Sequence, residues 1–310
     1  MFNADLEKVS VIGTGNVGST CAFLLAVNSL ANIMLFDKFE NIAEAKALDI
    51  GQSSVATDSS SIVSVGKSMV DLKDSKVVVI TAGISRKPGM SRQDLIKTNG
   101  AIAKELAADI KENAPQAIVI VVSNPLDLLT WIVLKETGFE RRKVFGMAGV
   151  VDNSRFKFFT AKKAGKSARK IKSHVLGMHS DEMVIPTEHI FVDDEAASVA
   201  LSESEIKELK ESTKNGGAQI VKLLGNGSAY YMPGTGAYLM CKSIIEDSRA
   251  VFDTCVNLDG EYGLKDVCLG VPVKIGDKGI EEIIELDLSP DSDNKLKENA
   301  KLFSEQLKLL

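Results

Sequence analysis

Short apolar runs alternate with longer helical patterns through the first half of the chain, and this alternation limits the fold more than any other feature. The runs cover residues 8–13 (KVSVIG), 31–37 (ANIMLFD), 61–66 (SIVSVG), 76–83 (KVVVITAG) and 117–125 (AIVIVVSNP). The segments 16–30, 39–50 and 94–113 lie between them and have helical spacing. Strands that are apolar on both faces and separated by helices indicate a parallel sheet covered on each side. We therefore predict an α/β fold built on a Rossmann-type doubly wound parallel sheet.

The pattern changes after about residue 150. A basic helical stretch covers 155–170, antiparallel strands are expected over 183–192 and 262–275, and an amphipathic helix over 290–310. We therefore expect two domains. Residues 1–147 are expected to form a Rossmann domain, and residues 148–310 a mixed α+β domain.

Composition excludes several classes of protein. The 310 residues carry a formal charge of -5, which argues against a nucleic-acid or anionic-membrane partner. The basic stretch 155–170 is therefore expected to be a solvated helical face or a subunit contact. The apolar runs are too short to span a bilayer, and the charged residues Asp5, Glu7 and Lys8 lead us to expect no signal peptide. Four scattered cysteines and three histidines favour a cytoplasmic protein with reduced thiols and no metal.

The segment VIGTGNVGS contains a G-x-G-x-x-G pattern with a strand expected before it and a helix after it. The first glycine allows a tight turn, the second lets a pyrophosphate approach the backbone, and the third lets helix and strand pack closely. Glycine-rich turns also serve packing alone, but Asp37 at the end of the next strand adds a carboxylate for ribose hydroxyls. That carboxylate would repel a 2′-phosphate, so NAD is favoured over NADP. The expected cofactor loop is Gly13, Thr14, Gly15, Asn16, Val17 and Gly18.

Two later segments carry candidate catalytic side chains. In VVDNSRF, Asp152 and Arg155 share a helical face. In GMHSDEM, His179 offers an imidazole whose ordinary pKa lies near working pH. The plainer alternatives are a surface ion pair for the first two and a structural role for the histidine.

These segments, read in order, resemble the lactate/malate dehydrogenase family. The resemblance rests on the glycine loop, Asp37, TAGISRKPGMSR, VVSNPLD, VVDNSRF and GMHSDEM, and it extends to residues 238–276. It therefore covers nearly the whole chain. Within the family, the chain looks like the malate dehydrogenases that share the architecture of lactate dehydrogenase. The resemblance implies hydride transfer between (S)-malate and NAD, a reaction of the tricarboxylic acid cycle.

The resemblance also implies roles for individual residues. His179 would exchange the hydroxyl proton of a 2-hydroxy acid, Asp152 would fix its tautomer, and Arg155 would clamp the C1 carboxylate. Asn124 would bind the substrate oxygen beside the nicotinamide. The remaining cofactor contacts would come from Asn99, Val122 and Ser123.

The cationic loop in residues 81–94 would be a lid that closes over substrate. Arg92 would polarise the C2 carbonyl in a site emptied of water. Arg86 stands where malate enzymes of the family carry Arg and lactate enzymes usually carry Gln, so it would meet a C4 carboxylate. The implied ligand is a small dicarboxylate, and the implied assembly is a homo-oligomer, dimeric or tetrameric. Two alternatives remain: a lactate or other 2-hydroxy-acid dehydrogenase, and a catalytically idle NAD-binding module.

One segment departs from the family pattern. The family usually has the pattern H-G-D-[ST]-M-V-P, whereas this chain has HSDEMVIP, with Ser180 in place of glycine and Pro186 one position later. If that glycine needs a positive φ, Ser180 would strain the turn.

Overall fold

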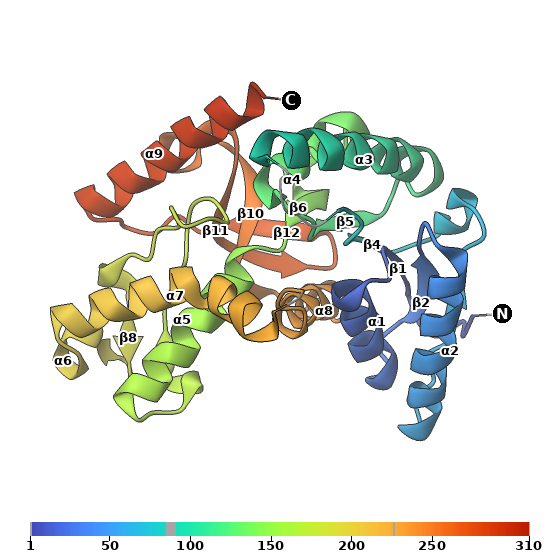
Figure 1. Ribbon diagram of the computed structural model, residues 1–310, viewed down its shortest axis with the longest axis horizontal. Coiled ribbons are helices and arrows are strands. Elements are labelled where there is room, and N and C mark those ends of the chain that lie inside the picture. The colour runs from blue at the N-terminus through green and yellow to red at the C-terminus, as the bar shows by residue number, and fades with distance from the viewer. Residues whose placement is uncertain (1, 85–90, 226, 310) are drawn as a thin grey trace.

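A computed structural model describes residues 2–84, 91–225 and 227–309 (Figure 1). Its main feature is a nine-stranded sheet in the order β12-β11-β10-β6-β5-β4-β1-β2-β3, of which the six strands β3-β2-β1-β4-β5-β6 are parallel. The predicted Rossmann-type parallel sheet is therefore confirmed. These strands are β1 (Lys8–Ile12), β2 (Asn32–Phe36), β3 (Val63–Val65), β4 (Val77–Ile80), β5 (Ile118–Val121) and β6 (Val144–Gly146).

Helices cover both faces of the parallel strands because those strands are apolar on both sides. Val77 and Val79 belong to the buried cluster that contains α1, whereas Val78 and Ile80 belong to the cluster that contains α3. Alternate residues of a strand point to opposite faces, so the two clusters lie on the two sides of the sheet. The helices are α1 (Asn16–Val27), α2 (Glu40–Ala56), α3 (Arg92–Asn113) and α4 (Leu126–Thr137) (Figure 1).

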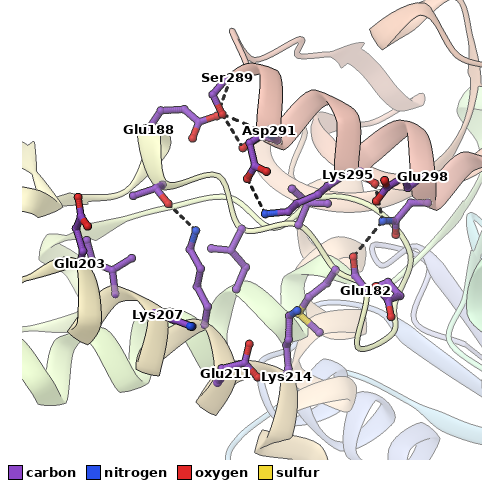
Figure 2. Close-up of a pocket in the computed structure, with 18 of the residues that line it drawn as sticks. Glu182, Glu188, Glu203, Lys207, Glu211, Lys214, Ser289, Asp291, Lys295 and Glu298 are labelled. Carbon is purple, nitrogen blue, oxygen red and sulfur yellow. Dashed lines mark hydrogen bonds and ion pairs between the residues drawn. The ribbon is translucent and has the colours of Figure 1, made fainter.

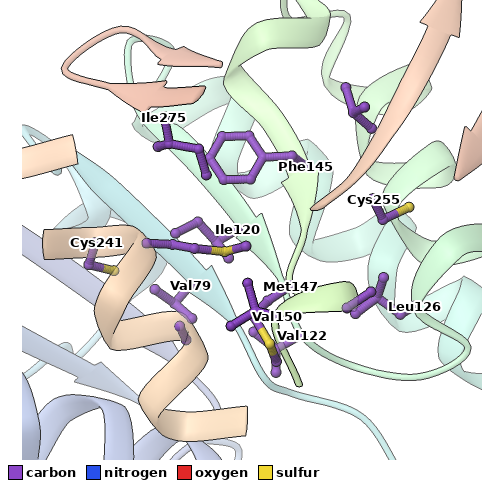
Figure 3. Close-up of a cluster of buried hydrophobic side chains, with 14 of the residues drawn as sticks. Val79, Ile120, Val122, Leu126, Phe145, Met147, Val150, Cys241, Cys255 and Ile275 are labelled. Atoms are coloured by element: carbon purple, nitrogen blue, oxygen red, sulfur yellow. The ribbon is translucent and has the colours of Figure 1, made fainter. Parts of the chain in front are cut away.

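The second half of the chain extends the same sheet with antiparallel strands. Cys255 of β10 pairs with Gly146 of β6, so hydrogen bonding continues from the first half into the second. Phe145, Met147 and Ile275 lie in one buried cluster near Cys241 of α8 (Figure 3). The added elements are β10 (Ala250–Asp259), β11 (Lys265–Gly276), β12 (Gly279–Ile283), α5 (Gly149–Ala164), α7 (Glu203–Leu224), α8 (Tyr231–Ile245) and α9 (Pro290–Leu307).

The prediction of a strand over residues 183–192 is wrong for most of its length. Val184 forms only an isolated bridge with Leu176, and residues 187–189 form a 3₁₀ helix. Pro186 has no N–H to donate to a ladder, which explains the break. Only Phe191–Val192 is a strand, β8, between β7 (Ile171–Lys172) and β9 (Glu195–Ala196) in a small antiparallel sheet that precedes α6 (Ala197–Ala200).

The basic helix is shifted relative to its prediction over 155–170. It begins at Gly149 and ends at Ala164, where Gly165 adopts a left-handed conformation (φ 64°) that closes the helix. Two lysines of this stretch pair within the chain: Lys163 of the helix lies 3.2 Å from Glu205, and Lys166, just beyond the helix, lies 2.6 Å from Asp193. Of the helices in the described part of the chain, none combines the length and apolar character needed to cross a membrane.

Candidate active site

The three glycines of the loop between β1 and α1 have three different surroundings. Gly13 has φ +100°, and a Cβ there would lie 2.6 Å from Ala82 N. At Gly18 a Cβ would lie 2.0 Å from Gly13 O, so α1 packs directly on the turn. At Gly15 a Cβ would meet no protein atom within 4 Å. The open side of the loop is therefore at Gly15, beside the N-terminus of α1, where backbone N–H groups favour a phosphate.

Asp37, at the end of β2, is bonded to the same loop. Its Oδ2 accepts hydrogen bonds from Thr14 N (2.7 Å) and Thr14 Oγ1 (2.8 Å), and its Oδ1 accepts from Phe39 N (3.0 Å). Burial by itself would raise the pKa of this carboxyl, but the hydrogen bonds from Phe39 and Thr14 outweigh burial and lower the pKa. The group is thus a carboxylate at neutral pH, as required to disfavour a 2′-phosphate.

The ends of β4 and β5 form a cavity of about 330 Å³ next to the glycine loop, lined by Val17, Gly83, Asn99, Val122, Ser123 and Asn124 among others. Asn99 is buried, and its side-chain amide is hydrogen-bonded to the backbone of two other residues. Its Nδ2 donates to Asn124 O (2.7 Å) and Ile84 O (3.1 Å), and its Oδ1 accepts from Ile84 N (2.9 Å). Asn99 therefore lies in the cavity wall and fixes the strand ends that shape it. Ser123 Oγ donates to Ala82 O (2.6 Å) and joins the same two strand ends.

His179, Asp152 and Arg155 lie together although they come from separate segments. His179 Nδ1 lies 2.6 Å from Asp152 Oδ2, and Arg155 Nη1 lies 3.1 Å from Asp152 Oδ1. The Asp152 side chain is only 2% exposed, which differs from the surface ion pair considered as the alternative. α5 begins directly beyond β6, so its first turns bring Asp152 and Arg155 to the carboxyl end of the sheet.

The imidazole of His179 is biased towards its protonated form. Burial alone would lower its pKa, but the charge and hydrogen bond of Asp152, together with the charge of Asp127, raise it above the ordinary value. Because Nδ1 faces the carboxylate, Nδ1 carries a proton in the neutral ring and Nε2 remains for a ligand. This arrangement suits reversible proton exchange at Nε2.

Asp127 is a polar residue of the site that the sequence reasoning missed. It is 3% exposed, and its Oδ2 accepts a hydrogen bond from His179 N (2.9 Å). Burial raises the pKa of Asp127 to about 6. Asp127 stands three residues after Asn124 in SNPLD, but a carboxylate that binds a distant backbone N–H leaves no spacing signature.

Arg155 lies against α7 at two consecutive glycines. A Cβ at Gly216 would lie 3.2 Å from Arg155 Cδ, and one at Gly217 would lie 3.4 Å from Arg155 Nη2. Larger side chains at these positions would crowd the guanidinium. No pattern in the sequence singled out this pair of glycines.

The two cations of the expected lid are placed differently. Arg86 lies outside the described residues. Arg92 is the first residue of α3, which starts with the Ser91 side chain accepting a hydrogen bond from Asp94 N (3.0 Å). Leu95, on the first turn of α3, lines a cavity of about 120 Å³ that is also lined by His179 and Asn124. The start of α3 therefore lies beside the imidazole.

Ser180 does not create the strain considered above. The positive φ in this segment belongs to Gly177 (φ 88°), and a Cβ there would lie 2.7 Å from Asn299 Oδ1. Ser180 N donates to Met178 O (2.8 Å), and its Oγ accepts from Glu182 N (3.2 Å). The serine therefore stabilises the turn that follows His179.

Comparison with known proteins gives one consistent result. Residues 7–146 match the family model of the lactate/malate dehydrogenase NAD binding domain, and residues 150–309 match that of the lactate/malate dehydrogenase alpha/beta C-terminal domain. A malate dehydrogenase of Aliarcobacter butzleri is 42% identical over 305 residues, which is 98% of this chain and 97% of that protein.

Solved structures with the same fold include both activities of the family. A malate dehydrogenase of Cryptosporidium parvum has a TM-score of 0.93 and 32% identity, with 98% of each chain covered. A lactate dehydrogenase of the same organism, complexed with lactic acid and nicotinamide adenine dinucleotide, has a TM-score of 0.94 and 34% identity over 98% of each chain. The fold alone therefore does not separate the two substrates.

Proposed function

This chain belongs to the lactate/malate dehydrogenase family, and from that premise we propose that it is an NAD-dependent malate dehydrogenase. The observation that carries the proposal is the His179–Asp152–Arg155 cluster at the carboxyl end of a dinucleotide-binding sheet. Its substrate would be a small dicarboxylate, (S)-malate or oxaloacetate. The 42% identity to a curated malate dehydrogenase supports this substrate over lactate.

The cofactor would lie across the carboxyl ends of the parallel strands. Residues 13–18 would receive the pyrophosphate, since the space beside Gly15 is open, and Asp37 would accept the ribose hydroxyls. Asn99, Val122, Ser123 and Asn124 line the adjacent cavity, which would hold the nicotinamide half. When bound, NAD supplies an acceptor for the hydride at C4 of its nicotinamide ring.

The residues of this chain would perform the rest of malate oxidation. Neutral His179 takes the proton of the C2 hydroxyl at Nε2 while the C2 hydrogen leaves with its electron pair. The products are oxaloacetate, NADH and one proton held by the imidazole. Asp152 stabilises the resulting imidazolium, because its Oδ2 accepts a hydrogen bond from Nδ1–H of His179 (2.6 Å between Nδ1 and Oδ2).

Arginines would set the orientation and the specificity of the substrate. Arg155 would hold the C1 carboxylate bidentately, and Arg92 would stabilise the charge that develops on the C2 oxygen. Arg86 would pair with the C4 carboxylate, which pyruvate lacks. A charge-assisted hydrogen bond is worth about 1.5–3 kcal/mol, and more where water is excluded. Arg86 would therefore favour oxaloacetate over pyruvate by about 10²-fold or more.

The decisive experiment compares kcat/KM for oxaloacetate and pyruvate, each with NADH and NADPH. We expect oxaloacetate with NADH to be preferred by about 10²-fold or more over pyruvate. Arg86→Gln should shift that preference towards pyruvate. A wild-type preference for pyruvate would instead favour the lactate dehydrogenase alternative, and dinucleotide binding without turnover would favour the idle module.

Assembly, location and domain division are further parts of the proposal. We propose a homo-oligomer, dimeric or tetrameric, because large apolar side chains are exposed on α2 (Leu48 67%, Val55 75%) and at the start of α8 (Tyr231 71%). Four buried free cysteines support a reducing, cytoplasmic location. Domains of 1–147 and 148–310 are supported by the two family matches, which meet near residue 148.

A further inference from the structure

A cavity of about 840 Å³ lies between α7, α9 and residues 182–188, outside the proposed active site (Figure 2). Lys207, Lys210 and Lys214 line it from α7, and Lys295 lines it from α9. The spacing of three and four residues places the three lysines of α7 on one face of that helix. Figure 2 shows Lys214 and Lys295 on the two helices that face each other across this space.

Lys210 has an unusual environment for an ammonium group. Its side chain is half-buried, and Nζ donates to the neutral hydroxyl of Thr187 (2.5 Å). Among the residues that the structure describes, no carboxylate forms an ion pair with Lys207, Lys210 or Lys214. Burial, followed by the nearby charge of Lys295, lowers the pKa of Lys210. The charges of Glu188 and Asp291 offset this only in part, and Lys214 lowers the pKa further. Removing an ammonium from water without a directly paired carboxylate is unfavourable, so the site favours an added anion.

The carboxylates of the cavity compensate the charge of Lys210 only in part, because Glu188 and Asp291 raise its pKa by less than burial and Lys295 lower it. Asp291 is paired with Lys295 (2.6 Å), and Glu188 accepts a hydrogen bond from Ser289 N (2.8 Å). The others that line it are exposed, where solvent and salt screen their charge: Glu182, Glu203, Glu211 and Glu298.

We propose that this cavity binds a small oxyanion of multiple charge, a phosphate or a polycarboxylate, between Lys210 and Lys214, with Lys207 at its mouth. The proposal does not depend on which 2-hydroxy acid is the substrate. It assigns a ligand to a space that the dehydrogenase reaction itself does not use.

The cavity wall is directly connected to the segment that carries His179. Asn299 of α9 lines the cavity, its Nδ2 donates to Glu182 O (3.0 Å), and its Oδ1 accepts from Met178 N (2.8 Å). Residues on both sides of His179 are thus bonded to one side chain of α9. An anion that holds α7 against α9 restrains this segment, so we expect it to change kcat/KM.

Calorimetric titration at constant ionic strength tests the site, with inorganic phosphate and citrate as the two probes. The wild-type chain should bind one anion, and Lys210→Met and Lys214→Met should each weaken binding at least tenfold. Lys222→Met is the matched control, since Lys222 is an exposed lysine of α7 outside the cavity, and it should bind as the wild type does. The stronger of the two probes identifies the class of anion.

Arg155→Gln separates this site from the proposed substrate site, because it removes the substrate clamp and should leave the new binding intact. Steady-state assays should show a saturable effect of the anion on kcat/KM that Lys210→Met and Lys214→Met abolish. The proposal is overturned if neither anion binds above a sodium chloride control, if both lysine variants bind normally, or if Arg155→Gln abolishes binding. If Lys210→Met fails to fold by circular dichroism, Lys214→Met decides the result.

Discussion

At the scale of single residues, two carboxylate–imidazole pairs in the described chain allow a controlled test of proton exchange. His179 pairs with Asp152 (2.6 Å), and His174 pairs with Asp253 (2.7 Å) outside the proposed substrate site. Oxaloacetate reduction needs the protonated imidazole, so kcat/KM should fall as pH rises through the raised pKa of His179. Asp152→Asn should move this fall to lower pH and reduce the plateau at least about tenfold. Asp253→Asn should leave the midpoint of the pH profile unchanged. If Asp152→Asn also had the wild-type midpoint, the assignment of His179 and Asp152 as the proton-exchanging pair would be contradicted.

Asp127 gives a second residue-scale prediction, about stability. Its pKa in the folded state is about 6, against an ordinary value of 3.8, so the folded state keeps the carboxyl protonated to a higher pH than the unfolded state does. Stability should therefore fall as pH rises between about 4 and 6, by up to about 3 kcal/mol for a shift of about two units. Asp127→Asn removes this titration. Urea unfolding of the wild type and of Asp127→Asn should be measured from about pH 4 to 7. The difference between their unfolding free energies should change between about pH 4 and 6. If the two free energies changed with pH in parallel, the raised pKa of Asp127 would be contradicted.

Residues of the site were predictable from the sequence where their chemistry is tied to a local pattern. Asp152 and Arg155 are three residues apart, and His179 stands in a segment that resembles a known family motif. Asp127 was not predictable, because its partner is the backbone N–H of a residue 52 positions away. Gly216 and Gly217 were missed because their contact with Arg155 depends on how α7 packs on α5.

At the scale of elements, two glycines of the β1–α1 turn are expected to have different roles: Gly15 leaves space for the cofactor, and Gly18 lets the helix pack on the turn. Gly15→Ala meets no protein atom and keeps an ordinary φ of -63°, so its unfolding free energy should change by less than about 1 kcal/mol. Its NADH affinity should fall at least tenfold, because the Cβ enters the proposed pyrophosphate space. Gly18→Ala should lower the unfolding free energy by about 1–3 kcal/mol or more, since its Cβ would lie 2.0 Å from Gly13 O.

Gly51→Ala, at a partly exposed position of α2, is the control for this pair. A Cβ there meets nothing within 4 Å, so the substitution should stabilise by up to about 1 kcal/mol and leave NADH binding unchanged. The measurements are urea unfolding and titration by NADH fluorescence. Unaltered NADH affinity in Gly15→Ala would mean that the pyrophosphate does not approach this loop.

The sequence specified the parallel part of the fold better than the antiparallel part. Strands β1, β4 and β5 are buried on both faces, so their apolar runs are continuous and visible in the sequence. β10 was missed, because its first residues are partly exposed and its pairing with β6 joins distant parts of the chain. Pro186 and its neighbours show the opposite error, in which an apolar segment lacks the hydrogen bonds of a strand.

At the scale of the whole molecule, one core crosses the boundary between the two proposed domains. Val9 and Leu25 from the first half share a buried cluster with Leu269, Val273 and Phe303 from the second. Neither half can expose its side of this cluster to water without losing apolar burial, which is the main stabilising term. The two proposed domains are therefore expected to unfold together.

The single tryptophan makes this cooperativity measurable. Trp131 of α4 donates from Nε1 to Asp266 Oδ1 (3.2 Å) of β11, so its fluorescence reports on the contact between the two halves. Urea transitions followed by Trp131 fluorescence and by far-UV circular dichroism should coincide. NADH at about 100 times its dissociation constant should raise the unfolding free energy by about 2.7 kcal/mol, whichever of the two signals is used to measure it. If fluorescence changed first while circular dichroism held a plateau, residues 1–147 and 148–310 would be separate folding units. NADH would then stabilise only the half that contains the glycine loop, and the shared core would contribute less than its burial implies.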